Sequence, residues 1–433
     1  MKINRLRVIG LFGLYDYEID FSRQGGDFTV LTSPNGYGKT TLLRIIRSLH
    51  VKRLYFLYTL KFKELSICFN DESELVAKEF DDIAKDKNEL DARANQRRGL
   101  SLKWYSNGKE LCHFDYIPED ILSAQNTVVR RIGGGRHYPM EVQEYDYDFF
   151  IDGEEGELLN TELAQNQKQE QFLLQLATVQ TDFIGANRIY TINRRTRTGR
   201  YRVEVPVLQI VLDLKERLQK ELNSFQSNFQ RLDSKFIDML LDGKGLEISE
   251  EEYIKKSESL LTLMDELTSY GLTNKQKLPE YQKTNSKILD VYLSLMEEKL
   301  LYYKDLLPLV RLFKKKVLQK HFANKTITLS PQHGMRIISD NGDILSADML
   351  STGEQNQLVL LYDLIFETPK GSILLIDEPE SSLHVAWQNE FVGDMQTIAK
   401  SKGLQIIVAT HSPIIVSNTS DENVFDLFFM QKV

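Results

Sequence analysis

A glycine-rich segment near the N-terminus constrains the fold of this chain more than any other feature. An apolar run at residues 28–31 precedes it, and a helical pattern at 42–46 follows it. Its residues are Ser33, Pro34, Asn35, Gly36, Tyr37, Gly38, Lys39, Thr40 and Thr41. A strand, a glycine loop with Lys-Thr and a helix in this order form a P-loop, which binds phosphate. The segment therefore predicts a nucleotide site.

The chemistry of such a loop gives each part a role. Backbone N–H groups turn inward around the β-phosphate, and the helix dipole adds positive potential behind them. Lys39 would reach the β- and γ-phosphates, and the Thr40 hydroxyl would ligate Mg²⁺. Ser33 stands where the usual pattern has its first glycine. A small residue can replace that glycine where the backbone angles are ordinary.

Composition limits the classes of protein to which the chain can belong. Its 433 residues, 42% hydrophobic and 27% charged, are typical of a soluble globular protein. No stretch is apolar enough to span a bilayer and no signal-peptide pattern is present, so we expect no membrane and a cytoplasmic location. The net charge of −8 argues against a surface that coats nucleic acid, but it permits a local basic groove. Cys68 and Cys112 are interpreted as small buried apolar residues.

Two segments of the C-terminal part carry phosphate chemistry. Residues 350–355 open a helix that Ser351 can cap, and the N-terminal amides of that helix, with Gly353, would bind a phosphate. Residues 373–376 form an apolar run typical of a buried parallel strand, and Asp377 and Glu378 follow. An aspartate at such a strand end holds Mg²⁺ through water, and the glutamate can polarise the attacking water.

A second buried strand is predicted at residues 404–409, and Thr410 and His411 follow it. A histidine at this strand end would lie beside the γ-phosphate. With this strand, the chain contains four segments that carry phosphate chemistry: the P-loop, residues 350–355, residues 373–378 and residues 404–411.

Together these motifs resemble the head of an ABC-type ATPase of the SMC/RecF/OLD group. The resemblance implies an α/β fold: a P-loop NTPase head with a mixed sheet flanked by helices, an antiparallel β subdomain, and an inserted helical or coiled-coil domain. It assigns an N-terminal lobe to residues 1–205, the insertion to 206–325 and a C-terminal lobe to 326–433.

By the same resemblance, residues 33–40 match Walker A, 350–355 the ABC signature, 373–378 Walker B and 379–384 the D-loop, and His411 matches the switch histidine. His384 replaces the D-loop aspartate of transporters. For the glutamine loop, Gln180 is only a candidate.

The resemblance also implies a mechanism with ATP and Mg²⁺. Two heads would face each other as a homodimer or part of a higher homo-oligomer, and each would offer its signature to the ATP held by the other. Closing requires the γ-phosphate, so hydrolysis opens the sandwich. The expected catalytic residues are Lys39, Glu378 and His411, the metal ligands are Thr40 and Asp377, and the signature contributes Ser351, Gly353 and Glu354.

The middle of the chain changes its periodicity. Strands are predicted at 65–69 and 102–105, with a hairpin turn at Asn107-Gly108 and a polar helical stretch from Asp81 to Arg98. From residue 206, apolar residues recur three and four apart, which predicts three helices; Pro308 interrupts the third. The first and third helices can form an antiparallel arm, and a compact helical domain is the alternative.

One basic cluster stands out: Arg188, Arg194, Arg195, Arg197, Arg200 and Arg202. Spaced among threonines and tyrosines, these arginines can line a phosphate backbone, which would permit direct DNA binding. The alternatives are a solvated hairpin or a contact with an acidic partner.

Three functions remain open. The first is a regulatory ATPase subunit of bacterial antiphage defence, similar to those of PARIS or Septu systems, with a separate effector nuclease and a phage-encoded trigger protein as partners. The second is a RecF-type ATPase of DNA repair or recombination. The third is a scaffold that binds ATP without hydrolysing it. Glu378 and His411 argue against the third, and residues 6–17 together with 34–42 most resemble the PARIS subunit.

Overall fold

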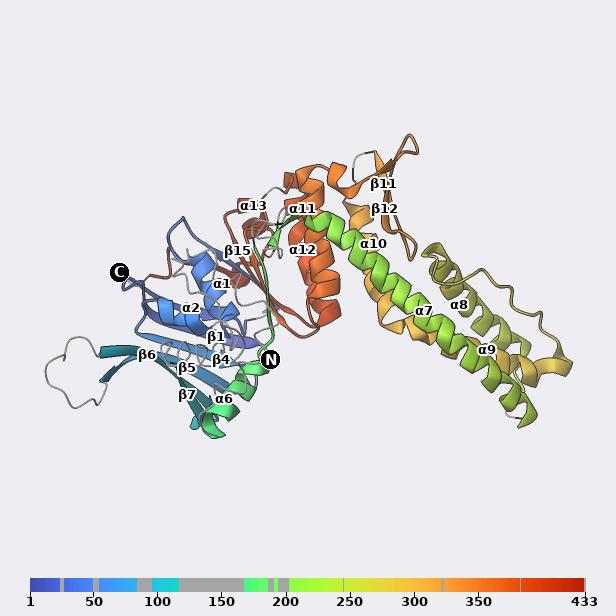
Figure 1. Cartoon of the computed structure of the whole chain (residues 1–433), viewed down its shortest axis with the longest axis horizontal. Coiled ribbons are helices and arrows are strands. Elements are labelled where there is room, and N and C mark those ends of the chain that lie inside the picture. The colour runs from blue at the N-terminus through green and yellow to red at the C-terminus, as the bar shows by residue number, and fades with distance from the viewer. Residues whose placement is uncertain are drawn as a thin grey trace, which may run out of the picture. The chain divides into compact units, whose positions relative to one another are not determined.

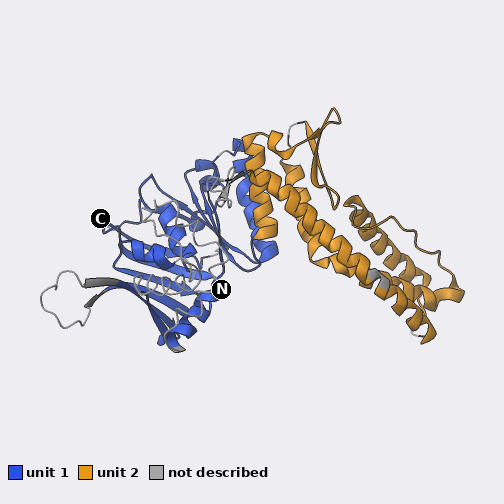
Figure 2. Ribbon diagram, viewed as in Figure 1, with its two compact units in different colours: residues 1–186, 368–433 blue, residues 187–367 orange. Residues whose placement is uncertain are grey.

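The computed structural model describes residues 1–23, 27–49, 54–83, 96–116, 167–185, 191–193, 202–243, 245–320, 322, 324–381 and 383–431. The chain divides into two compact units (Figure 2). The first comprises residues 1–186 and 368–433, and the second comprises residues 187–367. The first unit carries two sheets, and the second is mainly helical.

A parallel sheet forms the centre of the first unit. Its strands are β3 (Phe28–Thr32), β8 (Thr181–Ile184), β14 (Ile373–Asp377), β15 (Gln405–Thr410) and β16 (Val424–Asp426), in the order β16-β3-β15-β14-β8. Every residue of β14 and β15 is buried, as expected of parallel strands covered on both faces. Both predicted C-terminal strands are thereby confirmed.

Helices cover this sheet in a way that follows from side-chain alternation. Helix α1 (Lys39–Arg47) packs on β8, β14 and β15, and its apolar side chains share a core with Leu375 and Ile407. The neighbouring residues Leu374 and Ile406 are equally buried but lie outside that core. They therefore face the opposite side, where α12 (Val385–Lys402) contacts β3 and β15.

An antiparallel sheet completes the first unit and confirms the predicted β subdomain. It has the order β2-β1-β4-β5-β6-β7. Helices α2 (Leu54–Thr59) and α6 (Gln167–Ala177) pack on it, and aromatic pairs such as Phe69–Trp104, with ring centroids 5.3 Å apart, fill the core. The strands are β1 (Ile3–Leu11), β2 (Tyr15–Asp20), β4 (Glu64–Phe69), β5 (Ser73–Ile83), β6 (Gln96–Ser106) and β7 (Lys109–Tyr116).

Two predictions in this sheet have opposite outcomes. The Asn107-Gly108 hairpin is confirmed: both residues have positive φ, 50° and 75°, as a tight two-residue turn requires. The helical stretch from Asp81 to Arg98 is wrong at both ends, because the β5–β6 ladder continues through 81–83 and 96–98. There, strand pairing overrides the helical tendency of the polar residues.

Four helices build an elongated part of the second unit (Figure 1). They are α7 (Pro206–Leu241), α8 (Glu250–Ser269), α9 (Ser286–Leu300) and α10 (Leu306–Gln319). At 1.5 Å per residue, α7 is about 54 Å long. Helices α7 and α9 run antiparallel, because Phe225 contacts Tyr303 whereas Phe236 contacts Tyr292. The arm, rather than the compact alternative, is therefore the arrangement within this unit.

Pro308 does not break a helix, contrary to prediction. Helix α9 ends at Leu300, a 3₁₀ turn covers Leu301–Lys304, and α10 begins before the proline. Proline is tolerated in the first turn of a helix, where its missing N–H would have no partner. None of the helices in the described part of the chain combines the length and the apolar character that a bilayer crossing needs.

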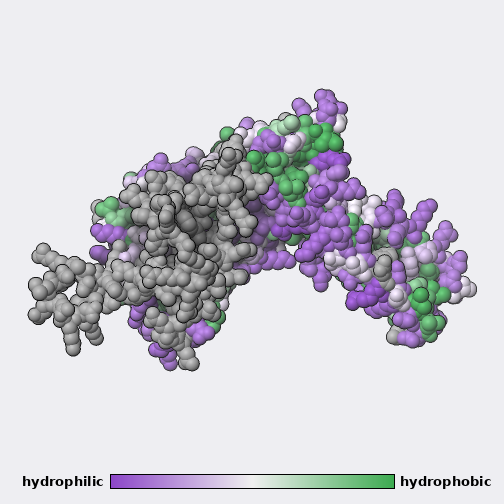
Figure 3. Space-filling model, in the orientation of Figure 1, coloured by the Kyte–Doolittle hydropathy of each residue, from purple (hydrophilic) through white to green (hydrophobic). Residues whose placement is uncertain are grey.

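The visible face of the arm is mainly hydrophilic (Figure 3). At the far end of α7, however, Leu241 and Leu246 are 81% and 75% exposed. A small hydrophobic area lies at that tip (Figure 3).

The second unit also includes residues 326–367, which the sequence assigned to the C-terminal lobe. A small sheet of β11 (Lys325–Ser330), β12 (Gly334–Ser339) and β13 (Ile344–Leu345) precedes α11 (Thr352–Tyr362) and a π-helical turn, Asp363–Glu367. These elements pack on α7: a Cβ added at Gly334 would lie 2.1 Å from the Val211 carbonyl oxygen, and Arg217 pairs with Glu367. A two-stranded ladder, β9 (Thr191–Asn193) with β10 (Arg202–Glu204), belongs to the same unit.

Candidate active site

Three adjacent strands of the parallel sheet bring the predicted motifs of the first unit to one edge. In the ladder, Leu31 of β3 lies beside Ala409 of β15, which lies beside Asp377 of β14. Because all three strands are parallel, their carboxyl ends meet at this edge, where ligands bind in open α/β sheets. The P-loop, Glu378 and His411 each follow one of these strand ends.

The P-loop turns through its two glycines. Gly36 and Gly38 have φ values of 90° and 81°, a left-handed conformation that glycine adopts without strain. Gly38 is the N-cap residue of α1, and its carbonyl accepts the hydrogen bond from Leu42 N–H at 2.8 Å. Ser33 has no such backbone conformation. The serine at the first glycine position therefore meets the condition stated from the sequence.

Lys39 is buried at the centre of this loop. Only 7% of the residue is exposed, and its Nζ donates hydrogen bonds to the carbonyl oxygens of Ser33, at 2.9 Å, and Pro34, at 3.3 Å. Burial lowers the pKa of Lys39, against the opposing effect of Glu378 and Asp377. The loop thus holds a cation where a phosphate would be received.

Thr40 and Asp377 join two motifs that are 337 residues apart. The Thr40 hydroxyl donates a hydrogen bond to Asp377 Oδ1 at 3.2 Å. Burial raises the pKa of Asp377, although the bond from Thr40 opposes it. A hydroxyl and a carboxylate are the hard oxygen ligands that Mg²⁺ prefers. Among the described residues, no group of three or more His, Cys, Asp or Glu is placed to hold a metal, so phosphate and water would supply the other ligands.

Glu378 has a strained backbone. Its φ of 44° is uncommon for a residue with a side chain. Its N–H donates to the Ala409 carbonyl at 2.8 Å, which fixes it to the neighbouring strand end, and Ser381 Oγ donates to its Oε2 at 3.3 Å. Such outliers concentrate at functional sites, where the surrounding structure maintains them. The role of Glu378 as the residue that polarises water stays a prediction.

The predicted D-loop histidine, His384, and the glutamine-loop candidate, Gln180, both make hydrogen bonds near their own strand or helix. His384 is the N-cap residue of α12, where its Nδ1 accepts a hydrogen bond from Ala386 N–H at 3.2 Å. Gln180 precedes β8, and its carbonyl accepts from Ile373 N–H at 2.9 Å. Most of the arginine cluster lies outside the described residues; the backbone of Arg202 is in β10.

Aromatic side chains flank the P-loop, and of these only Tyr37 was predicted from the sequence as part of the nucleotide site. The Tyr37 ring lies 5.7 Å from Tyr15 and 5.5 Å from Phe428. Phe12, in the β1–β2 turn, has a positive φ of 57° and is 40% exposed. Burial raises the pKa of Tyr17, whose hydroxyl donates to the Tyr37 carbonyl, to about 12. The density of aromatic residues in 12–17 was the available signal, and Phe12 and Phe428 are the exposed members of this group, at 40% and 45%.

The signature residues lie in the second unit, at the start of α11. Ser351 is the N-cap residue, and the predicted cap is a full capping box with Glu354. Glu354 Oε2 accepts hydrogen bonds from Ser351 N–H and Oγ, both at 2.9 Å, and Oε1 pairs with Lys325 at 3.0 Å. Both oxygens of Glu354 are therefore engaged inside the unit, which gives this residue a supporting place behind Ser351 and Gly353. Lys325 was not identified from the sequence.

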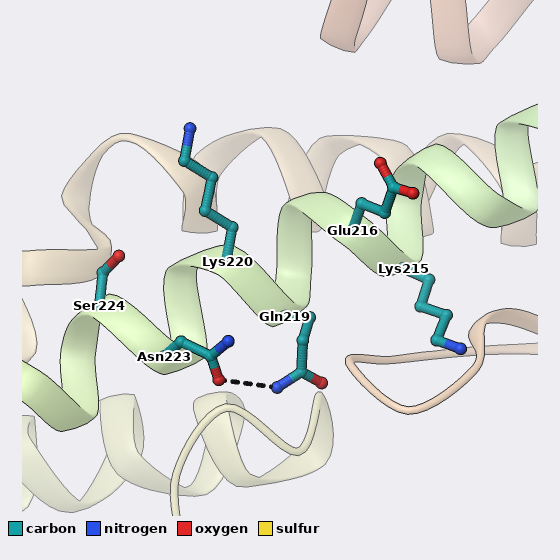
Figure 4. Close-up of a pocket in the computed structure, with 6 residues that line it drawn as sticks. All are labelled: Lys215, Glu216, Gln219, Lys220, Asn223 and Ser224. Carbon is teal, nitrogen blue, oxygen red and sulfur yellow. Dashed lines mark hydrogen bonds between the residues drawn. The ribbon is translucent and has the colours of Figure 1, made fainter.

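A shallow depression on α7 has no convergent chemistry. The side chains of Lys215 and Lys220 point away from each other, and Gln219 Nε2 donates to Asn223 Oδ1 at 2.9 Å (Figure 4). Polar groups that diverge do not form a site for a small molecule. The lining residues are Lys215, Glu216, Gln219, Lys220, Asn223 and Ser224.

Comparisons with known proteins give one family match and several similar solved structures. A family model described as AAA ATPase domain matches residues 1–416. Among solved structures, the Smc head domain of Pyrococcus furiosus bound to the C-terminal domain of ScpA is similar at 14% identity and a TM-score of 0.34, over 96% of this chain and 92% of that chain. The SMC head domain of Thermotoga maritima is similar at 12% identity and a TM-score of 0.30, over 97% and 93%. A search of curated proteins found no match.

Proposed function

Because the chain belongs to the AAA ATPase domain family, we propose that it hydrolyses ATP as a switch that controls a separate effector. The observation that carries the proposal is the bond between Thr40 and Asp377. It joins the P-loop to the end of β14 and places a hydroxyl and a carboxylate beside the buried Lys39. Those three groups are what a magnesium nucleotide requires.

Each residue at this edge of the sheet has a separate role in the proposed reaction. Lys39 and the loop amides bind the phosphates, and Thr40 and Asp377 would hold Mg²⁺. When bound, Mg²⁺ neutralises charge on the phosphate oxygens. Glu378 orients and polarises the attacking water, and His411 contacts the γ-phosphate from the neighbouring strand end.

Two copies are needed for a complete site in this proposal. Ser351 and Gly353 lie at the N-terminus of α11, where the positive end of the helix dipole favours an anion. Each copy would offer Ser351 and Gly353 to the γ-phosphate held by the other. ATP would close the pair, and hydrolysis would open it.

For the effector, we propose a nuclease of an antiphage defence system, held inactive until a phage protein binds the ATPase. The support is the resemblance of residues 6–17 and 34–42 to PARIS-type subunits. The alternative is an ATPase of DNA repair that binds DNA through the arginines of 188–202. Arginine–phosphate contacts would give strongly salt-dependent duplex binding, which an effector held through apolar contacts would not require.

One experiment tests both the proposed ATP hydrolysis and the proposed effector. The chain is purified from its native operon, its copurifying proteins are identified, and phosphate release from ATP is measured. Hydrolysis, an associated nuclease and protection of cells from phage that depends on Lys39 are expected. Hydrolysis by a monomer in light scattering would contradict the sandwich. Tight, salt-sensitive DNA binding that Arg194→Glu and Arg195→Glu abolish, without phage protection, would favour the repair function.

A further inference from the structure

Glu380, three residues beyond β14, holds the end of the neighbouring strand β15. Its Oε2 accepts a hydrogen bond from the Thr410 hydroxyl at 2.7 Å, and its Oε1 accepts from the backbone N–H of His411 at 2.6 Å. Thr410 is fully buried. We propose that Glu380 is a positioning residue that sets the place of His411 at the γ-phosphate. The inference rests on the proposed ATPase function.

A chain of hydrogen bonds extends this contact into the following turn. The Ser412 N–H donates to Thr410 Oγ1 at 2.9 Å, so the threonine hydroxyl accepts one bond while it donates another to Glu380. The Ser412 hydroxyl donates to Gln388 Oε1 at 2.7 Å, and Gln388 Nε2 donates to the Leu383 carbonyl at 3.0 Å. The segment after β14 therefore holds the segment after β15 at two points.

The same two segments are also joined at the candidate base. Glu378 N–H donates to the Ala409 carbonyl, one residue before Thr410. Three consecutive positions, 409–411, are thus tied to residues 378–380. A shift of one segment is therefore coupled to a shift of the other, and Glu380 supplies the bond that reaches the His411 backbone.

A carboxylate is required at this position for a chemical reason. Both of its partners are donors, and an ionised carboxylate is an acceptor at both oxygens. A glutamine of the same shape would turn its NH₂ group toward one of the two donors. If the NH₂ group faces Thr410, the buried threonine hydroxyl loses its acceptor, which costs more than the loss of an average hydrogen bond.

A direct role of the Glu380 charge is the competing explanation. Burial lowers the pKa of Lys39 and the Glu380 carboxylate acts against that effect, so its removal would alter the electrostatics of nucleotide binding. The two explanations separate kinetically. A positioning residue affects kcat and leaves the binding of ATP nearly unchanged, whereas a direct charge effect changes the dissociation constant of ATP.

The test uses the full chain with Glu380→Gln, and Glu422→Gln, a change at an exposed carboxylate of the same unit, as the matched control. We expect Glu380→Gln to lower kcat about tenfold, with the dissociation constant of ATP changed by less than about twofold. Thr410→Val should act in the same direction, and Thr410→Ser, which retains the hydroxyl, should restore activity. A loss of ATP affinity equal to the loss in kcat would overturn the proposal.

A double-mutant cycle shows whether Glu380 acts through His411. In a His411→Ala background, Glu380→Gln should have little further effect on kcat, because the group that it positions is absent. If the two substitutions together lowered kcat by the product of their separate effects, the inference would be contradicted.

Hydrogen exchange supplies a readout that does not depend on catalysis. The backbone amides of residues 410–412 should exchange faster in Glu380→Gln than in wild type, and Glu422→Gln should not change them. Unchanged exchange would disprove the inference even in an active enzyme. If the wild type hydrolyses no ATP but the exchange result holds, the proposed function fails and the structural role of Glu380 remains.

Discussion

The edge of the parallel sheet and the start of helix α11 are the two places where we propose that phosphate binds, but they are built in different ways. At the sheet edge, the groups come from segments hundreds of residues apart, such as Thr40 and Asp377, and Glu378 has a strained backbone. At α11, the capping box lies within four consecutive residues, and one distant residue, Lys325, supports it. The first site depends on tertiary assembly, whereas the second is mostly local.

This difference predicts where a single substitution does most damage. At the sheet edge each polar group has its own task, so its loss cannot be compensated. At α11 we expect a single change in the cap to cost only about 1 kcal/mol, because the helix beyond its first turn keeps its own backbone hydrogen bonds.

The largest effect is expected at Lys39. Lys39→Ala removes the buried cation of the P-loop, so ATP binding should weaken by at least about a hundredfold and hydrolysis should become undetectable. Titration with a fluorescent ATP analogue measures the binding. Lys61→Ala, at an exposed position of the same unit, is the control and should bind normally. Normal nucleotide binding by Lys39→Ala would place the phosphates elsewhere.

The next prediction separates catalysis from strain at Glu378. Glu378→Gln should retain ATP binding and lower hydrolysis about a hundredfold, because the amide cannot polarise water as a carboxylate does. Glu378→Gly and Glu378→Ala should both be inactive, but the glycine variant should be more stable by about 1 kcal/mol, because φ is positive at this position. Urea unfolding compares the two. An alanine variant as stable as the glycine variant would refute the strain argument.

The sequence predicts the local parts of both sites better than the parts that depend on tertiary contacts. Motifs that are contiguous in the chain, such as the P-loop and the capping box of Ser351 and Glu354, were found because local pattern determines local structure. The hairpin at Asn107-Gly108 was found for the same reason. The identities of Glu378 and His411 as site residues remain predictions, although their strands meet at one edge as expected.

What the sequence could not predict depends on tertiary contacts. Lys325 reaches Glu354 across 29 positions, and Glu380 reaches Thr410 across 30, and no spacing rule connects such pairs. The inclusion of residues 326–367 in the helical unit likewise depends on packing against α7. The polar stretch 81–98 was misassigned because strand pairing, a non-local interaction, decided its ends.

A moderate effect is expected when the distant support of α11 is removed. Lys325→Met leaves Glu354 buried without its cation, so the signature start should loosen and hydrolysis should fall about fivefold to tenfold, while ATP binding by the P-loop persists. Lys325→Arg should recover most of the activity. Lys304→Met, at an exposed position of the second unit, is the control. Activity of Lys325→Met equal to that of the control would mean that the local capping box suffices.

The smallest effect concerns pH and tests whether the capping box contributes as an ionised group. Burial acts to raise the pKa of Glu354, but the hydrogen bonds from Lys325 and Ser351 outweigh it and hold the pKa below its ordinary value. A carboxyl whose pKa is lower in the folded state contributes stability that is present above its unfolded pKa and is lost as the pH falls through the folded value. The contribution of Glu354 should therefore be full near neutral pH and decline below about 4.5, the ordinary value.

The measurement is the difference in urea midpoint between wild type and Glu354→Gln across this range, because the difference removes the titration of all other carboxyls. Wild type should be the more stable near neutral pH, and the gap should narrow as the solution becomes more acidic. Glu258→Gln, at an exposed position on α8, should show no such dependence on pH. A gap that stays constant with pH would mean that Glu354 supports α11 by its hydrogen bonds alone, and the start of α11 would then be as local as its sequence pattern implies.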